Sequence, residues 1–133
     1  MAEYLSTLPN FLVYLGIGIG LLAVFMVVYA WLTPQREMPL IRQGNVSASV
    51  VFGATLLGFA LPLASAVAHS VNVIDLALWG AIACVVQAIA SLVLRLLIHD
   101  LRAHIEADRV SVAITMASFK LAFGLLNAAA VSY

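Results

Sequence analysis

Hydrophobic residues fill four long stretches of the chain, separated by short connections that carry most of the polar residues. The stretches cover residues 11–32, 46–68, 74–98 and 110–131. Each reaches the roughly 20 residues that a helix, rising about 1.5 Å per residue, needs to cross a hydrocarbon core about 30 Å thick. The pattern predicts an all-α integral membrane four-helix bundle that forms a single membrane domain over residues 1–133.

Composition agrees with this class and narrows the possible functions. The chain is 65% hydrophobic and 9% charged, and its mean hydropathy is +1.13, whereas soluble domains are roughly 45–50% apolar and 25% charged. Four spans leave no segment for a soluble catalytic domain. We find no nucleophile with a base, no paired carboxylates and no ligand cluster at one depth, so we expect no catalytic residue, cofactor or metal. Without a basic patch, nucleic acid is not an expected partner.

Basic residues predict the orientation of the chain in the membrane. Arg36 and Arg42 lie between the first two stretches, and Arg102 and Arg109 lie between the last two, whereas both termini and the turn near residue 70 contain no Lys or Arg. The positive-inside rule therefore places the two charged connections in the cytoplasm and both termini outside it. We interpret the chain as a multi-pass protein of a bacterial inner membrane.

The chain also resembles itself at a shift of 64 residues. Without gaps, this shift brings Val46 over Val110 and Phe59 over Phe123, among other identities. It predicts two repeats of two helices each, at about 11–69 and 75–133. Because each repeat crosses the membrane twice, the two repeats would run parallel to each other. Convergent use of Leu, Ala and Gly is the alternative explanation.

Several local signals concern helix ends and helix packing. Asn10, Asn45 and Asp108 precede the first, second and fourth stretches, and each is a residue type that caps helix N-termini. Residues 99–109 are predicted to continue the third helix into the cytosol. Four glycines are candidates for close helix packing: Gly16, Gly20, Gly53 and Gly58.

Lys120 stands near the middle of the last stretch, where a charge costs roughly 2.5 kcal/mol or more. Its helix face also carries Ala113, Ala117, Gly124 and Asn127, which are small or polar, so we expect this face to meet protein rather than lipid. Thr55, Gln87 and Lys120 fall at similar depths near the membrane midplane, and Asn127 shares the face of Lys120. Together these four residues are the predicted midplane polar site. Three states of the lysine stay open: a neutral amine; snorkelling toward the cytoplasm; or the lining of a water-filled cavity or oligomer axis that admits an anion. Snorkelling and hydrogen-bonded packing are the structural interpretations, and the cavity is the functional one.

The segments "IRQGNVSASVVFGATLLGFALPLASA", "SVNVIDLALWGAIACVVQ" and "GLLNAA" resemble the YjfL-type family of small bacterial inner-membrane proteins. The resemblance runs from about Thr33 to the C-terminus and excludes Lys120. It implies four spans built from two copies of a two-helix unit, and a link to membrane stress, but no reaction. The positions that match the family pattern are Arg42, Asn45, Ser49, Gly53, Thr55, Gly58, Pro62, Ser65, Asp75, Trp79, Gly80, Gln87 and Asn127.

Two functions are compatible with these features. The first is a non-enzymatic module in the lipid bilayer that forms homo-oligomers through its glycine-rich faces and presents its charged connections to a cytoplasmic protein, in envelope or membrane stress. The second is a small channel or transporter that uses the polar midplane site around Lys120. The glycine faces motivate the first hypothesis and the polar layer the second.

Overall fold

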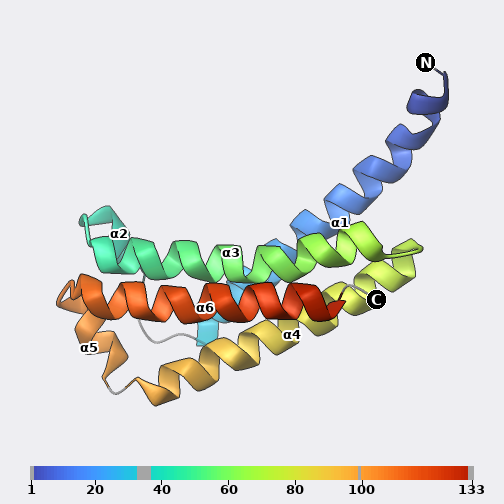
Figure 1. The fold of residues 1–133 in the computed structure, drawn as a ribbon. Coiled ribbons are helices and arrows are strands. Elements are labelled where there is room, and N and C mark those ends of the chain that lie inside the picture. The colour runs from blue at the N-terminus through green and yellow to red at the C-terminus, as the bar shows by residue number, and fades with distance from the viewer. Residues whose placement is uncertain (1, 33–36, 99, 132–133) are drawn as a thin grey trace.

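The computed structural model describes residues 2–32, 37–98 and 100–131 and places them in six helices (Figure 1). Four are long and apolar enough to cross a membrane: α1 (Ala2–Leu32), α3 (Val46–His69), α4 (Val73–Leu97) and α6 (Val110–Val131). Two short helices, α2 (Glu37–Arg42) and α5 (Leu101–Glu106), precede α3 and α6. The predicted all-α class and the four membrane-length helices are confirmed.

Helices α3 and α6 lie side by side along most of their length, and α4 packs against both (Figure 1). Three groups of buried apolar side chains hold these helices together along the bundle. One group joins Val51, Leu101, Ile105 and Met116 near the short helices, the middle one joins Tyr29, Phe59, Leu63 and Cys84, and the third joins Ala66, Leu76, Ala83 and Val131. Since lipid tails are as apolar as these side chains, close packing rather than exclusion of water stabilises the contacts inside the bilayer.

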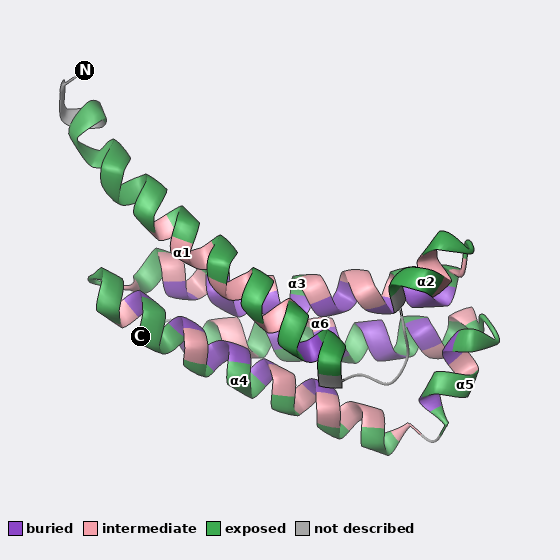
Figure 2. Cartoon of the chain, turned by 180° about the vertical axis from the view of Figure 1, so that it is seen from behind, coloured by how far each residue is buried: buried purple, intermediate pink, exposed green. Residues whose placement is uncertain are grey.

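Helix α1 crosses the other three long helices obliquely, and its N-terminal end extends beyond them (Figures 1 and 2). None of the most hydrophobic 18-residue stretch of α1 is buried, whereas 44% of the corresponding stretch of α3 is. The C-terminal end of α1 lies against the middle of α4. This tilt carries residues near the end of α1 to the centre of the bundle.

Three sequence predictions about helix ends are wrong. Helix α1 begins at Ala2 rather than near residue 11, so Asn10 lies inside it and cannot cap it, because a cap residue needs a non-helical backbone. Helix α4 ends at Leu97, and α5 starts only after Asp100, whose φ of 55° interrupts the helical path. Asp108 has the same φ of 55°, and its side chain bonds to α3 instead of α6.

The turns that lead into α3 and α6 share their geometry at a spacing of 64 residues. Gly44 and Asp108 both have positive φ values, 85° and 55°. Backbone hydrogen bonds from Asn45 N to Leu40 O and from Arg109 N to His104 O measure 2.9 and 3.0 Å. These turns agree with the shift seen in the sequence, while the parallel arrangement of two whole repeats stays a prediction.

Candidate functional site: a buried lysine among four helices

Lys120 lies on the face of α6 that meets the other helices, and only 1% of the residue is exposed. Ala113, Ala117 and Gly124 on the same face are buried as well. The small side chains let the neighbouring helices approach the lysine closely. The face that the sequence predicts to contact protein does so.

Two hydroxyl groups bind the side-chain nitrogen of Lys120. Its Nζ atom donates hydrogen bonds of 2.6 Å to Tyr29 Oη on α1 and 2.6 Å to Thr55 Oγ1 on α3. The Thr55 hydroxyl in turn donates to the carbonyl of Val51 at 2.9 Å. Its proton therefore has an acceptor on α3, and its oxygen accepts from the lysine. Nζ also lies 4.6 Å from the centre of the Tyr29 ring, within the range of cation–π attraction.

Helix α4 contributes Gln87, which is 1% exposed, to the same centre. Gln87 Nε2 donates a 3.1 Å hydrogen bond to the backbone carbonyl of Lys120. Gly58 on α3 leaves room for this amide, because a Cβ atom at Gly58 would lie 2.8 Å from Gln87 Nε2. Each of the four long helices thus places one polar residue in what we call the lysine centre: Tyr29, Thr55, Gln87 and Lys120.

The lysine centre contains no carboxylate. The six acidic residues of the chain lie at or near helix ends: Glu3, Glu37, Asp75, Asp100, Glu106 and Asp108. A charge at the middle of a spanning helix costs about 2.5–3.5 kcal/mol, and here hydroxyl oxygens and one aromatic ring offset that cost. Lys120 is 1% exposed and bonded to hydroxyls of two other helices, so within one chain it neither snorkels nor lines a water-filled space. The neutral amine and the oligomer axis stay predictions.

Asn127 does not belong to this centre. It lies seven residues after Lys120 on α6, about 10 Å along the helix axis, and its Nδ2 donates to the carbonyl of Ala83 at 2.9 Å. The structure therefore brings together Thr55, Gln87 and Lys120 but places Asn127 at a second contact between α6 and α4.

Sequence reasoning missed Tyr29. Tyr29 stands three residues before the end of α1, and depth counted along the chain places it near a membrane boundary rather than at the midplane. It reaches Lys120 because α1 is oblique, which no periodicity in the sequence indicates. A hydroxyl-bearing aromatic in an otherwise apolar span is the one signal that would have pointed to it.

The predicted packing glycines fall into two groups. Gly58 lies at an internal helix contact, whereas Cβ atoms built on Gly16, Gly20 and Gly53 would meet no atom within 4 Å. The tightest backbone contact involves Gly124, which the sequence analysis treated only as a small neighbour of the lysine. A Cβ atom there would lie 3.0 Å from the Gly58 carbonyl oxygen.

The two charged connections contact each other through the N-terminus of α3. Asn45 caps α3 as predicted, since its Oδ1 accepts from Ala48 N at 2.8 Å, and its Nδ2 donates to the carbonyl of Ile105 in α5 at 2.8 Å. Asp108 Oδ1 accepts from Ser47 N at 2.8 Å. This backbone hydrogen bond holds the pKa of the Asp108 carboxyl below its ordinary value, because it stabilises the charged form.

The arginines of these connections differ in their surroundings. Arg102 Nε donates to Glu106 Oε1 at 2.9 Å, and Arg109 Nη1 lies 3.0 Å from His104 Nδ1. Arg42 is the last residue of α2 and is exposed. Arg36 lies outside the described residues.

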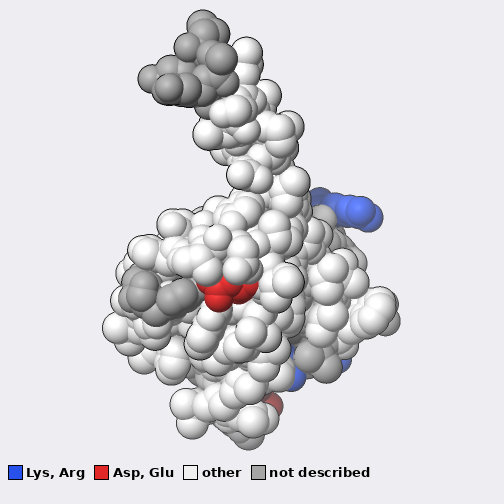
Figure 3. Space-filling view, turned by 90° about the vertical axis from the view of Figure 1, so that its right-hand side faces the viewer, with Lys and Arg blue, Asp and Glu red and all other residues white. Residues whose placement is uncertain are grey.

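From the opposite end of the bundle most of the visible surface carries no charge, with one acidic patch near its centre and charged groups of both signs at the rim (Figure 3).

Four apolar helices of membrane length, packed around a polar centre, define a multi-pass integral membrane protein. The chain belongs to the family described as Domain of Unknown Function (DUF350), whose model matches residues 3–131. It is 34% identical over 129 residues to the UPF0719 inner membrane protein YjfL of two Escherichia coli strains, a match that covers 97% of this chain and 98% of each relative. No solved structure matches the chain.

Proposed function

We propose that this protein is a non-enzymatic, homo-oligomeric module of the inner membrane whose closed bundle presents its two charged connections to a cytoplasmic protein. The observation that carries the proposal is the closed lysine centre, in which Lys120 is 1% exposed and bonded to hydroxyls of two other helices. A permeation path through the middle of this bundle would have to separate these contacts. The centre instead joins the helices into one unit.

Thiol labelling tests whether water reaches the lysine centre. In a Cys84→Ala background, we expect Lys120→Cys and Ala117→Cys to resist a membrane-impermeant thiol reagent from both sides of sealed vesicles, because both positions are buried. Ala117→Cys keeps the lysine in place, and Ala103→Cys on the exposed surface of α5 is the labelled control. Labelling at 117 from either side would contradict the closed bundle.

One observation favours the alternative of a small channel or transporter. Gln87 Oε1 is buried without a hydrogen-bond partner in the described part of the chain, and a buried acceptor left unpaired costs about 1–3 kcal/mol. A polar solute that passes through the bundle would supply the missing donor. If position 117 labels, ion and solute flux through proteoliposomes, compared with protein-free vesicles, becomes the deciding measurement.

The oligomer is supported by the outer face of α1. Gly16 and Gly20 are exposed, lie four residues apart and have open space around them, which suits the close crossing of two helices in a membrane. In the Cys84→Ala background we expect Gly20→Cys to form disulfide-linked dimers in membranes. Gly18→Cys is the matched control because Gly18 faces Val67 within the same chain. Equal crosslinking at both positions, or none at 20, would refute this interface.

A further inference from the structure

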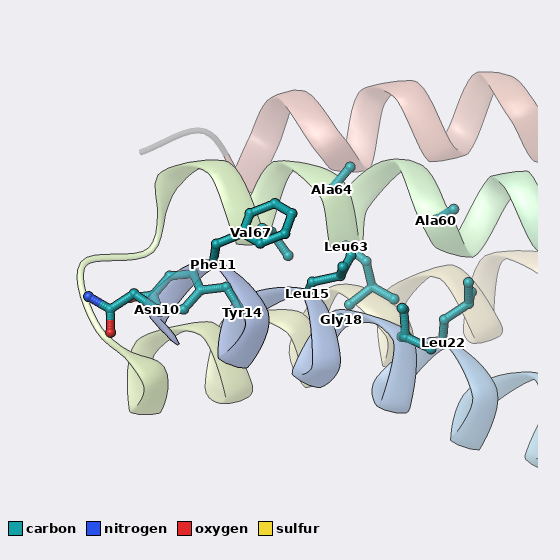
Figure 4. Close-up of a pocket in the computed structure, with 11 residues that line it drawn as sticks. Asn10, Phe11, Tyr14, Leu15, Gly18, Leu22, Ala60, Leu63, Ala64 and Val67 are labelled. Atoms are coloured by element: carbon teal, nitrogen blue, oxygen red, sulfur yellow. The ribbon is translucent and has the colours of Figure 1, made fainter. Parts of the chain in front are cut away.

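An apolar groove runs between α1 and the second half of α3 (Figure 4). Its volume is about 460 Å³. Helix α1 supplies larger side chains, including Phe11 and Leu15, while α3 contributes Ala60 and Ala64, whose small side chains leave the space open. The groove exists because α1 is oblique and does not pack along α3 over its whole length.

The lining of the groove is apolar apart from its outer end. Asn10 stands at that end and points away from the groove interior (Figure 4), and the Tyr14 side chain lies one turn further in. Water finds few hydrogen-bond partners in such an apolar groove, and an unfilled groove forfeits the dispersion contacts of its walls. An apolar occupant therefore suits the groove.

The length of the groove suits an acyl chain. From Asn10 to Leu22 it extends over 12 residue steps of α1, or about 18 Å, close to the roughly 15 Å of one leaflet's hydrocarbon. The groove is open along one side, so an acyl chain can enter it directly from the surrounding bilayer.

We propose that this groove binds one acyl chain of a membrane phospholipid, from the leaflet on the side of the N-terminus. The exposed side chains of Phe11, Leu15 and Ile19 make the groove continuous with the lipid-facing surface of the spanning helices. The chain end of the lipid lies toward Leu22, and its headgroup lies near Asn10, where the polar atoms are. The lipid fills the space between α1 and α3 and holds α1 at its angle.

The test is native mass spectrometry of the protein released from mild detergent micelles after purification from membranes. We expect one phospholipid per chain to stay bound, and Ala64→Phe to reduce the lipid-bound fraction about tenfold because the ring fills the groove. Ala122→Phe is the matched control, since Ala122 is exposed on α6 away from the groove. Ala60→Phe repeats the test at a second position should Ala64→Phe misfold.

Three results would overturn the proposal. One is the absence of any retained phospholipid. Another is equal retention by the wild type and both groove variants, which would place the lipid elsewhere. The third is efficient disulfide dimerisation of Leu15→Cys in a Cys84→Ala background, which would show that a second copy covers the groove. The proposal does not depend on whether the lysine centre is closed, so the labelling experiment and this one can fail separately.

Discussion

Replacing Gly124 with alanine is expected to lower the free energy of unfolding by about 1–3 kcal/mol, the usual cost of overpacking. The added Cβ would lie 3.0 Å from the Gly58 carbonyl oxygen and 3.1 Å from Gly58 Cα. These are backbone atoms of α3, so no side chain can rotate out of the way. Helices α3 and α6 would have to separate, and the separation would lengthen the bond between Lys120 and Thr55.

Intrinsic helix propensity predicts the opposite effect for a glycine-to-alanine change. Alanine favours a helix over glycine by about 1 kcal/mol, so a glycine without neighbours should gain stability on the same change. Gly53→Ala on α3 is this control, because its Cβ would meet nothing within 4 Å. Thermal unfolding in detergent should therefore move in opposite directions for the two variants. A shift of the same sign and size in both would show that the crossing at Gly124 is not tight.

Replacing Tyr29 with phenylalanine is expected to lower the free energy of unfolding by about 1–3 kcal/mol when Lys120 is present, because a buried donor loses one of its acceptors. Nζ donates to Oη at 2.6 Å, and a hydrogen bond from a charged amine is stronger than one between neutral groups. In a Lys120→Met background the same change should cost less, because the bond to Nζ is already gone. The difference between the two backgrounds measures the coupling of the pair directly.

Lys120→Met by itself should change the stability little, since it removes both the mid-membrane cost of about 2.5–3.5 kcal/mol and the contacts with Tyr29 and Thr55 that offset it. The unbranched methionine side chain fills similar space. Tyr14→Phe, which removes a hydroxyl from the same helix at the apolar groove, is the control for the tyrosine change. Equal effects of Tyr29→Phe with and without the lysine would contradict the pairing of these residues.

Stability and position of α1 can then be separated. If Lys120→Met is at least as stable as the wild type, the lysine does not contribute net stability. Its role is then to fix the position of α1 in the bundle. Its bonds to Tyr29 and Thr55 select one placement of α1 against the other helices. In that case α1 should take more than one position in the Lys120→Met variant. Cysteine pairs that are adjacent in the structure of α1 and α3 should then crosslink with less preference over non-adjacent pairs than in the wild type.

The cap predictions show how far local sequence signals reach. Asn45 was predicted correctly because its cap is local, formed with Ala48 three residues later. Asp108 is the same kind of signal, yet it bonds to Ser47, which is 61 residues away. Its left-handed backbone, at φ 55°, is not the extended one of an N-cap, and its residue type alone does not reveal this.

The sequence by itself determined the class of the protein, the four spanning helices and the buried face of α6, because length, apolarity and helical periodicity are properties of each segment alone. It also placed Thr55, Gln87 and Lys120 at a common depth. Only the tertiary structure decided that Tyr29 joins them, that Asn127 does not, and that Gly124 rather than Gly16 or Gly20 lies at a tight internal crossing. These depend on the oblique path of α1 and on which helix faces meet, and both result from packing between distant segments.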